Sequence, residues 1–214
     1  MDAKLAAARW RSKAVRRTLD VVVAGILLLL LLPLLLIIAI SVKLDSRGPI
    51  LFRQRRLGKD MHPFTVLKFR TMQTGAAHDL HVRYIAQLAT TQNGHDTSEL
   101  KKLTNDPRVT RVGRVLRRLS LDELPQLLNV LAGRMWLVGP RPAIEYEIQH
   151  YEPAHFERFN VRPGITGLWQ VSGRNALGFK DMLELDAEYA ATATLGKDLR
   201  ILARTPRAAI RNAA

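Results

Sequence analysis

The sequence predicts an α+β fold, mostly helical, with an N-terminal membrane helix broken at a proline and a compact domain with a small β element. Three observations carry this prediction. Residues 21–42 form an uncharged run of 22 residues that contains one proline, Pro33. Two short β-rich segments follow, and helical periodicity dominates the rest. A length of 214 residues and a hydrophobic content of 47 % suffice for one domain with a core.

Composition divides the chain into three parts. Residues 1–20 are a basic flank, residues 21–42 are the membrane helix, and residues 43–214 are the domain expected in the cytosol. The chain holds 33 Lys and Arg against 19 Asp and Glu. This excess predicts a polyanionic partner, such as nucleic acid, an anionic membrane surface or a phosphate-bearing substrate. The absence of Cys excludes disulfides, thiolate metal sites and a Cys nucleophile.

The apolar run admits two interpretations. Its length corresponds to roughly 33 Å of helix, enough to span a hydrocarbon core of about 30 Å, and a spanning helix tolerates a proline kink. However, Pro33 removes a backbone donor and bends the helix, which leaves two arms that are each too short to span. Basic residues also flank both ends, and each flank favours the cytoplasmic side. From these features alone, a spanning helix and a helix that enters and leaves on one side are equally supported.

The first part of the domain is expected to be a β hairpin followed by a loop and a helix. Segments 49–58 and 63–72 are β-rich and bounded by Gly and Pro, which predicts the hairpin. Residues 73–105 are polar and predict an exposed loop between short helices. In a helical conformation, residues 108–119 would place apolar side chains on one face and arginines on the other, which predicts a basic amphipathic helix.

The second part is expected to be mainly helical. Residues 121–132 predict a helix that starts with an S-x-x-E capping box of Ser120 and Glu123. A helix is predicted at 143–158 and an irregular segment at 161–175. The tail from residue 179 onward is predicted to be helical and to end in a basic amphipathic helix. Such a helix either lies on a membrane surface or packs on its own domain.

The adjacent acids Asp122 and Glu123 are open to a structural and a chemical interpretation. Structurally, Glu123 completes the capping box and Asp122 suits the helix dipole. Chemically, Arg117, Arg118 and Arg141 together with a helix N-terminus can bind a diphosphate. A carboxylate beside that phosphate is a candidate nucleophile, kept ionised by the arginines, and its neighbour can hold Mg²⁺. Physical chemistry permits this arrangement without selecting it.

Several long motifs occur in a specific order. They are "RRTLDVVVAG", the Pro-broken apolar run, "GPILFRQRRLGKDMHPFTVLKFRTM", "RVTRVGRVLRRLSLDELPQLLNVLAGRMWLVGPRP" and "VRPGITGLWQVSGRN". From about residue 14 to 202 the chain therefore resembles the bacterial sugar transferase family, the monotopic phosphoglycosyl transferases, in its short minimal form.

The resemblance implies an activity. It implies transfer of a sugar-1-phosphate from a UDP-sugar to undecaprenyl phosphate, giving undecaprenyl-diphosphate-sugar and UMP. This is the first membrane step of exopolysaccharide, O-antigen or other glycan synthesis. The implied location is the cytoplasmic face of the bacterial inner membrane, where the apolar helix re-enters at Pro33. Membrane lipids are then partners, nucleic acid is not, and a homo-oligomer is compatible.

The resemblance also implies roles for individual residues. Asp122 is the nucleophile that forms a covalent aspartyl-phosphosugar, and Glu123 is associated, together with Asp122, with Mg²⁺. Arg117 and Arg141 are linked to phosphate binding. The remaining substrate-binding candidates are Lys68, Arg70, Arg162, Arg174 and Asn175.

Two other classes of function compete with this one. The formal net charge of +14 suggests a membrane-tethered nucleic-acid binder. Against it, aromatic residues make up only 6 % of the chain and are not interleaved with the basic runs, as a stacking surface requires. A non-catalytic basic membrane adaptor is the other alternative, and it predicts that Asp122→Asn leaves function intact.

Overall fold

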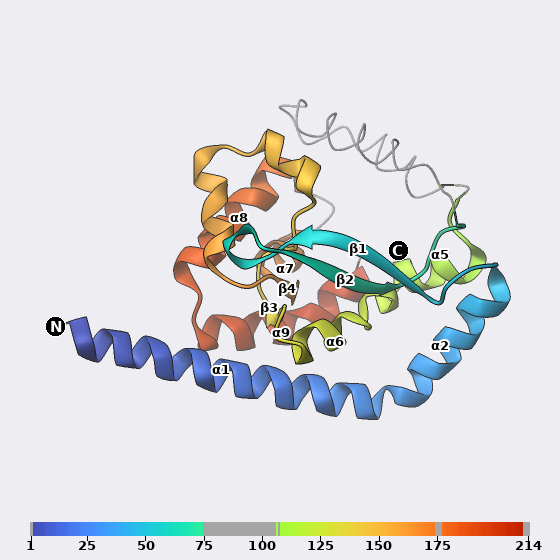
Figure 1. Ribbon diagram of the computed structural model, residues 1–214, viewed down its shortest axis with the longest axis horizontal. Helices are drawn as coiled ribbons and strands as arrows, with labels where there is room; N and C mark the ends of the chain where they lie inside the picture. The colour runs from blue at the N-terminus through green and yellow to red at the C-terminus, as the bar shows by residue number, and fades with distance from the viewer. Residues whose placement is uncertain (1, 75–105, 107, 174–176, 212–214) are drawn as a thin grey trace.

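The computed structural model describes residues 2–74, 106, 108–173 and 177–211, with side chains described within residues 14–209. Within these ranges, helices predominate and four short strands form two two-stranded sheets. The predicted α+β, mostly helical fold is therefore confirmed. Figure 1 shows α1 along one edge of the molecule, with α2 turning away from its end and a long hairpin crossing the body.

The N-terminal apolar run is a bent pair of helices, α1 (Asp2–Leu30) and α2 (Leu32–Asp45). α1 from Ala14 onward and α2 meet at 64°. The break lies at Leu31, and Pro33 occupies the first turn of α2, where a missing N–H group costs least. α1 continues without interruption through the predicted boundary at residue 20.

The bent pair keeps a large apolar surface exposed. Leu29 and Leu30 before the bend and Leu44 near the end of α2 are each more than 70 % exposed. No single helix of the described residues is long and apolar enough to cross a membrane. Taken together, α1 from Ala14 onward and α2 are long and apolar enough, by length and composition only. In water, an apolar surface of this extent marks an interaction site.

Arginine side chains attach the two ends of the bent pair to the same domain. Near the start, Arg16 forms an ion pair of 2.6 Å with Asp198, and Arg17 donates to the carbonyl of Leu131 at 2.8 Å. At the far end, Arg70 donates to the carbonyls of Val42 (3.1 Å) and Ser46 (2.7 Å), which terminates α2. Both ends of the apolar run therefore lie against one body.

The predicted hairpin is confirmed. β1 (Leu51–Leu57) and β2 (Pro63–Phe69) pair antiparallel, with Leu51 opposite Phe69 and Leu57 opposite Pro63. A short 3₁₀ turn, η1 (Lys59–Met61), connects them. Most of the predicted loop at 73–105 falls outside the described residues.

The predicted basic helix is present as α5 (Arg111–Arg118). The Thr110 side chain caps it by accepting from the N–H of Gly113 at 3.0 Å, and Asp45 of the α2 terminus accepts from the N–H of Val112 at 3.0 Å. A Cβ at Gly113 would lie 2.2 Å from the carbonyl oxygen of Thr71, so this close approach requires glycine.

The predicted helix at 143–158 is wrong in type. The structure has two 3₁₀ helices, η3 (Glu145–His150) and η4 (Pro153–Asn160). Pro153 accounts for the break between them, since the residue before a proline avoids the α region and Glu152 is extended. The predicted irregular segment is also partly regular, because β4 (Gly164–Thr166) pairs in parallel with β3 (Trp136–Val138) and α7 (Leu168–Ser172) follows.

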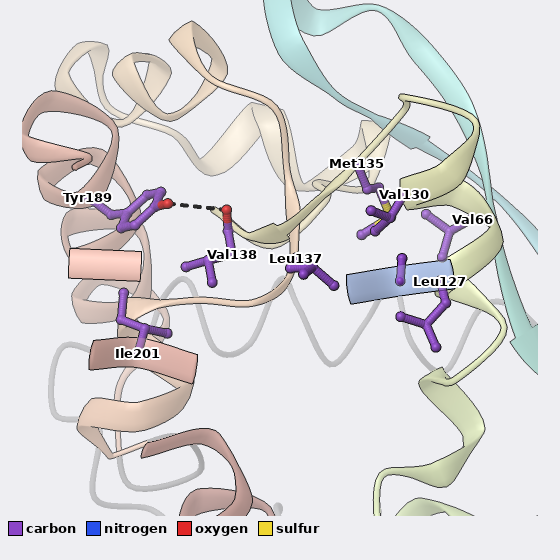
Figure 2. Close-up of a cluster of buried hydrophobic side chains, with 9 residues drawn as sticks. Val66, Leu127, Val130, Met135, Leu137, Val138, Tyr189 and Ile201 are labelled. Atoms are coloured by element: carbon purple, nitrogen blue, oxygen red, sulfur yellow. Dashed lines mark hydrogen bonds between the residues drawn. The ribbon is translucent and has the colours of Figure 1, made fainter. Parts of the chain in front are cut away.

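The tail forms α8 (Phe179–Thr192) and α9 (Leu195–Arg211), as predicted. Both contribute to the main core, which also receives Ala24 of α1. Figure 2 shows this cluster, in which the Tyr189 hydroxyl donates to the carbonyl of Val138 at 3.1 Å. The apolar N-terminal helix is therefore part of the domain core as well as part of the exposed apolar surface.

Candidate functional site

The acid pair lies in a tight turn rather than in the predicted long helix. Asp122 and Glu123 belong to η2 (Leu121–Glu123), a 3₁₀ turn that precedes α6 (Gln126–Leu131). Ser120 has a left-handed backbone with φ of 56°, and its side chain does not cap the turn. The predicted capping box is therefore wrong, because an N-cap residue needs an extended backbone to present its side chain to the next turn.

Glu123 instead contacts the hairpin. The Lys68 ammonium group on β2 donates to Glu123 Oε1 at 2.6 Å. The two side chains are 26 % and 30 % exposed, so the pair borders solvent. Lys68, one of the predicted substrate-binding candidates, is thus brought directly beside the acid pair.

The charge state of Asp122 follows from several competing effects. Burial and the neighbouring Glu123 raise the pKa of Asp122 to about 6, and Lys68 and Arg117 only partly oppose them. The arginine acts in the predicted direction, but burial outweighs it. Asp122 is consequently mainly ionised at pH 7 and becomes protonated in mild acid.

Arg117 and Arg141, the two predicted phosphate ligands, lie on different elements, and of the two it is Arg117 that acts on the charge of Asp122. Arg117 is exposed in the last turn of α5. Arg141 lies in the "PRP" segment after β3 and is partly buried. Within the described part of the chain, neither guanidinium forms a hydrogen bond or an ion pair.

Arg70 and Arg162, the other predicted substrate-binding residues that the structure describes, form no hydrogen bond or ion pair with Asp122 or Glu123 within the described ranges. Arg70 is 5 % exposed, and its guanidinium donates to carbonyls at and just after the end of α2. Arg162 precedes β4, and no contact joins it to Asp122 or Glu123 in the described ranges. Arg174 and Asn175 lie outside the described residues.

The fit of the site to Mg²⁺ rests on the two adjacent carboxylates. Among the residues that the structure describes, no group of three or more His, Asp or Glu side chains converges. Mg²⁺ commonly binds one or two protein carboxylates and takes its remaining ligands from substrate phosphates and water. Asp122 and Glu123 match that pattern and do not match an all-protein metal cage.

Comparison with known proteins identifies the family. A family model described as bacterial sugar transferase matches residues 11–212. The chain belongs to the bacterial sugar transferase family. The family resemblance inferred from the motifs is thereby confirmed.

Curated relatives of this bacterial sugar transferase include three informative proteins. The exopolysaccharide production protein ExoY of Rhizobium meliloti is 42 % identical over 190 residues, which cover 89 % of this chain and 83 % of that protein. The UDP-glucose:undecaprenyl-phosphate glucose-1-phosphate transferase of Caulobacter vibrioides is 44 % identical over 200 residues, 89 % of this chain and 67 % of that protein. The undecaprenyl-phosphate galactose phosphotransferase of Salmonella typhimurium is 37 % identical over 205 residues, 95 % of this chain and 42 % of that protein.

Sequence reasoning missed Arg56 in this bacterial sugar transferase. Its side chain on β1 is buried and donates to the carbonyl of Pro142 at 2.9 Å and to Gln54. Burial and the nearby Arg141 lower the pKa of Arg56 to about 10, and Glu147 and, to a smaller extent, Glu123 partly offset this effect. The sequence signal for Arg56 was the alternation of side chains along a strand. This alternation places Arg56 on the face opposite to the exposed Arg53 and Arg55.

Proposed function

We propose that this transferase moves a sugar-1-phosphate from a UDP-sugar to undecaprenyl phosphate, producing undecaprenyl-diphosphate-sugar and UMP. The observation that carries the proposal is an ionisable acid pair beside Lys68 at 2.6 Å, with the guanidinium groups of Arg117 and Arg141 unpaired in the described ranges. Cations without protein partners suit a phosphate-bearing substrate. The named activities of the relatives from Caulobacter vibrioides and Salmonella typhimurium support the same reaction class.

The chemistry is two displacements at one phosphorus atom. A carboxylate oxygen of Asp122 attacks the phosphorus that carries the sugar, and the bond from that phosphorus to the bridging oxygen of UMP breaks. UMP leaves with the bridging oxygen, and Asp122 holds the phosphosugar as an acyl phosphate. A phosphate oxygen of undecaprenyl phosphate then attacks the same phosphorus, which releases the product and regenerates the carboxylate.

The surrounding charges lower the repulsion between the carboxylate and the diphosphate. Lys68 lies at the acid pair, and Arg117 and Arg141 can bind phosphate oxygens as they approach. Asp122 and Glu123 are the residues that would hold Mg²⁺, which when bound supplies charge neutralisation for the transferring phosphate. Because Asp122 has a pKa of about 6, it is available as an ionised nucleophile near neutral pH.

We further propose that α1 and α2 form a re-entrant element on the cytoplasmic face of the bacterial inner membrane. The support is that Arg16 and Arg17 near its start and Arg70 at its end bind the same domain. A spanning helix would place these two ends on opposite sides of the bilayer. Resting on one leaflet, the site can meet a cytosolic UDP-sugar and an acceptor phosphate that is held at the surface by its lipid tail.

A covalent-labelling experiment tests the central proposal. Purified protein is incubated with Mg²⁺ and a panel of UDP-sugars labelled in the sugar, without acceptor lipid. We expect UMP release and one labelled phosphosugar on the peptide that contains residue 122, detected by mass spectrometry. The panel also identifies the donor sugar.

Two variants make that experiment decisive. Asp122→Asn should abolish both UMP release and labelling. Asp181→Asn is the matched control, since Asp181 is an exposed aspartate that accepts from the N–H of Gly178, and an asparagine keeps that acceptor. UMP release by Asp122→Asn at the rate of the unaltered protein would contradict the proposal.

The two other classes of function are not favoured. Membership in a family of sugar transferases argues for catalysis and against a purely adaptor role. The arginines that contribute to the basic net charge include Arg16, Arg17 and Arg70, which bind groups of the protein itself. These side chains do not form a free cationic surface of the kind that nucleic-acid binding requires.

A further inference from the structure

The backbone on both sides of Arg141 is fixed by hydrogen bonds. Four hydrogen bonds to neighbouring elements fix the residues on either side of it, in addition to the bonds of Arg141 itself. They are Gly139 N–H to Thr166 O (2.8 Å), Gly164 N–H to Pro140 O (2.9 Å), Arg56 Nη1 to Pro142 O (2.9 Å) and Leu57 N–H to Ala143 O (2.8 Å). The four partner residues belong to β1 and β4.

Arg141 itself is held by a buried ion pair. Its N–H group donates to Asp186 Oδ2 at 3.2 Å, and its carbonyl accepts from Arg158 Nη2 at 2.7 Å. Arg158 and Asp186 are joined at 2.6 Å, which closes a ring of three contacts. Both polar backbone groups of Arg141 are therefore bound by one side-chain pair, while its guanidinium forms no bond in the described ranges.

The ion pair is poorly explained by stability alone. The side chains of Arg158 and Asp186 are 4 % and 2 % exposed, so both charges lose their hydration. Asp186 Oδ1 is buried without a hydrogen-bond partner among the described residues. Apolar side chains of similar volume often stabilise a core as well as such a pair does, because they avoid the cost of desolvating two charges. A buried pair that binds one specific backbone unit suits a role in placing that unit.

We propose that Arg158 and Asp186 are positioning residues that fix Arg141 for binding the diphosphate of the sugar donor. This inference rests on the proposed function, in which Arg141 binds a donor phosphate. Arg158 comes from η4 and Asp186 from α8, so the placement of Arg141 depends on the packing of these two elements. Phosphate recognition by a fork of guanidinium donors is sensitive to such placement.

Steady-state kinetics of Arg158→Lys test the proposal. Lysine keeps the charge, but its single nitrogen cannot occupy the positions of both Nη2, which donates to Asp186 and to the carbonyl of Arg141, and Nη1, which donates to the Tyr151 hydroxyl. We expect KM for the UDP-sugar to rise roughly tenfold or more, with KM for undecaprenyl phosphate unchanged, because small displacements of a binding group cost this much or more. An unchanged KM for the UDP-sugar in the folded variant would overturn the proposal.

The matched control is Lys180→Gln. Lys180 and Glu152 form an ion pair at 2.8 Å that also joins α8 to the start of η4, but both side chains are more than half exposed. Its loss should leave both KM values unchanged. A rise in the donor KM equal to that of Arg158→Lys would overturn the proposal, because it would assign the effect to helix packing in general.

A double-mutant cycle with Arg141→Ala separates positioning from general damage. Once the Arg141 side chain is absent, Arg158→Lys should add no further rise in the donor KM, since coupled residues give non-additive effects. Additive effects would overturn the positioning role and leave the proposed function intact. Donor kinetics of Arg141→Ala equal to those of the unaltered protein would overturn the phosphate role of Arg141 and the positioning inference with it.

A charge-free variant covers the case in which Arg158→Lys does not fold. Arg158→Met combined with Asp186→Leu replaces both members, which avoids leaving one buried charge unpaired. We expect this protein to fold, with a single cooperative thermal transition, and still to show the elevated donor KM. A donor KM equal to that of the unaltered protein would overturn the proposal.

Discussion

Two basic regions of this molecule use the same kind of side chain in opposite ways. In the N-terminal attachment region, Arg16 and Arg17 bind Asp198 and backbone carbonyls of the domain. In the candidate site, the guanidinium groups of Arg117, which acts on the charge of Asp122, and of Arg141 have no such partner in the described part of the chain. The difference indicates that an arginine guanidinium is available to a substrate where no carbonyl or carboxylate of the protein binds it.

The attachment region should respond to mutation through stability. Arg16→Ala leaves Asp198 as a buried charge without its partner, since these side chains are 12 % and 6 % exposed. We expect a loss of about 3–5 kcal/mol in the free energy of unfolding, measured by denaturation of the detergent-solubilised protein. Arg55→Ala is the control, because it removes an ion pair whose members are 70 % and 55 % exposed and should cost less than about 1 kcal/mol. Equal losses in the two variants would contradict the distinction between the regions.

The site region should respond through activity. Arg141→Ala removes the guanidinium that we propose binds a phosphate of the sugar donor, and we expect kcat/KM for the UDP-sugar to fall about 10²–10³-fold. The melting temperature should change little, because no hydrogen bond of the guanidinium is lost within the described part of the chain. UMP release measures the effect, with the exposed Arg134→Ala as the control. A loss of stability without a loss of activity would place Arg141 with the structural arginines instead.

The pH dependence of transfer should report the environment of Asp122. Its pKa, raised from 3.8 to about 6, means that the ionised carboxylate, which we propose is the nucleophile, is lost as pH falls through 6. We expect the rate to fall about tenfold for each pH unit below 6, once protonation limits the nucleophile. Raising the Mg²⁺ concentration should shift this acid limb of the pH–rate profile to lower pH, because a bound cation favours the ionised carboxylate. A limb that does not respond to Mg²⁺ would argue against a metal at the acid pair.

Lys68→Met should produce the smallest change. Lys68 lowers the pKa of Asp122, so its removal should move the acid limb to higher pH. The rate at pH 8, where Asp122 is ionised in both proteins, should be less affected than the rate at pH 6. The pH–rate profiles of UMP release measure this shift. A limb that moves to lower pH would contradict the assignment of Lys68 as the neighbouring cation.

Local patterns predicted a large part of the fold. The hairpin, α5 and the tail helices followed from period and from Gly and Pro punctuation, which act over a few residues. The same local rules failed where several weak signals competed. Ser120 carries a capping pattern but adopts a left-handed backbone in a 3₁₀ turn, and Pro153 divides the predicted helix into two.

The candidate site was predicted in part. The motif singled out Asp122, Glu123, Arg117 and Arg141, whose roles stay predictions, and it did not show that the Arg70 guanidinium binds carbonyls at the end of α2. Arg56, Arg158 and Asp186 were missed because their importance lies in contacts with the segment around Arg141, which is 17 to 86 residues away in the chain.

By itself, the sequence determined the acid pair, the bend near Pro33, the hairpin and the family. These features depend on which residues are neighbours along the chain. Only the tertiary structure decided which cationic side chains are bound by groups of the protein, that Lys68 contacts Glu123, and that burial raises the pKa of Asp122. The physical reason is that hydrogen bonding and desolvation depend on which groups the fold brings within a few ångströms of one another, and distant segments supply those groups.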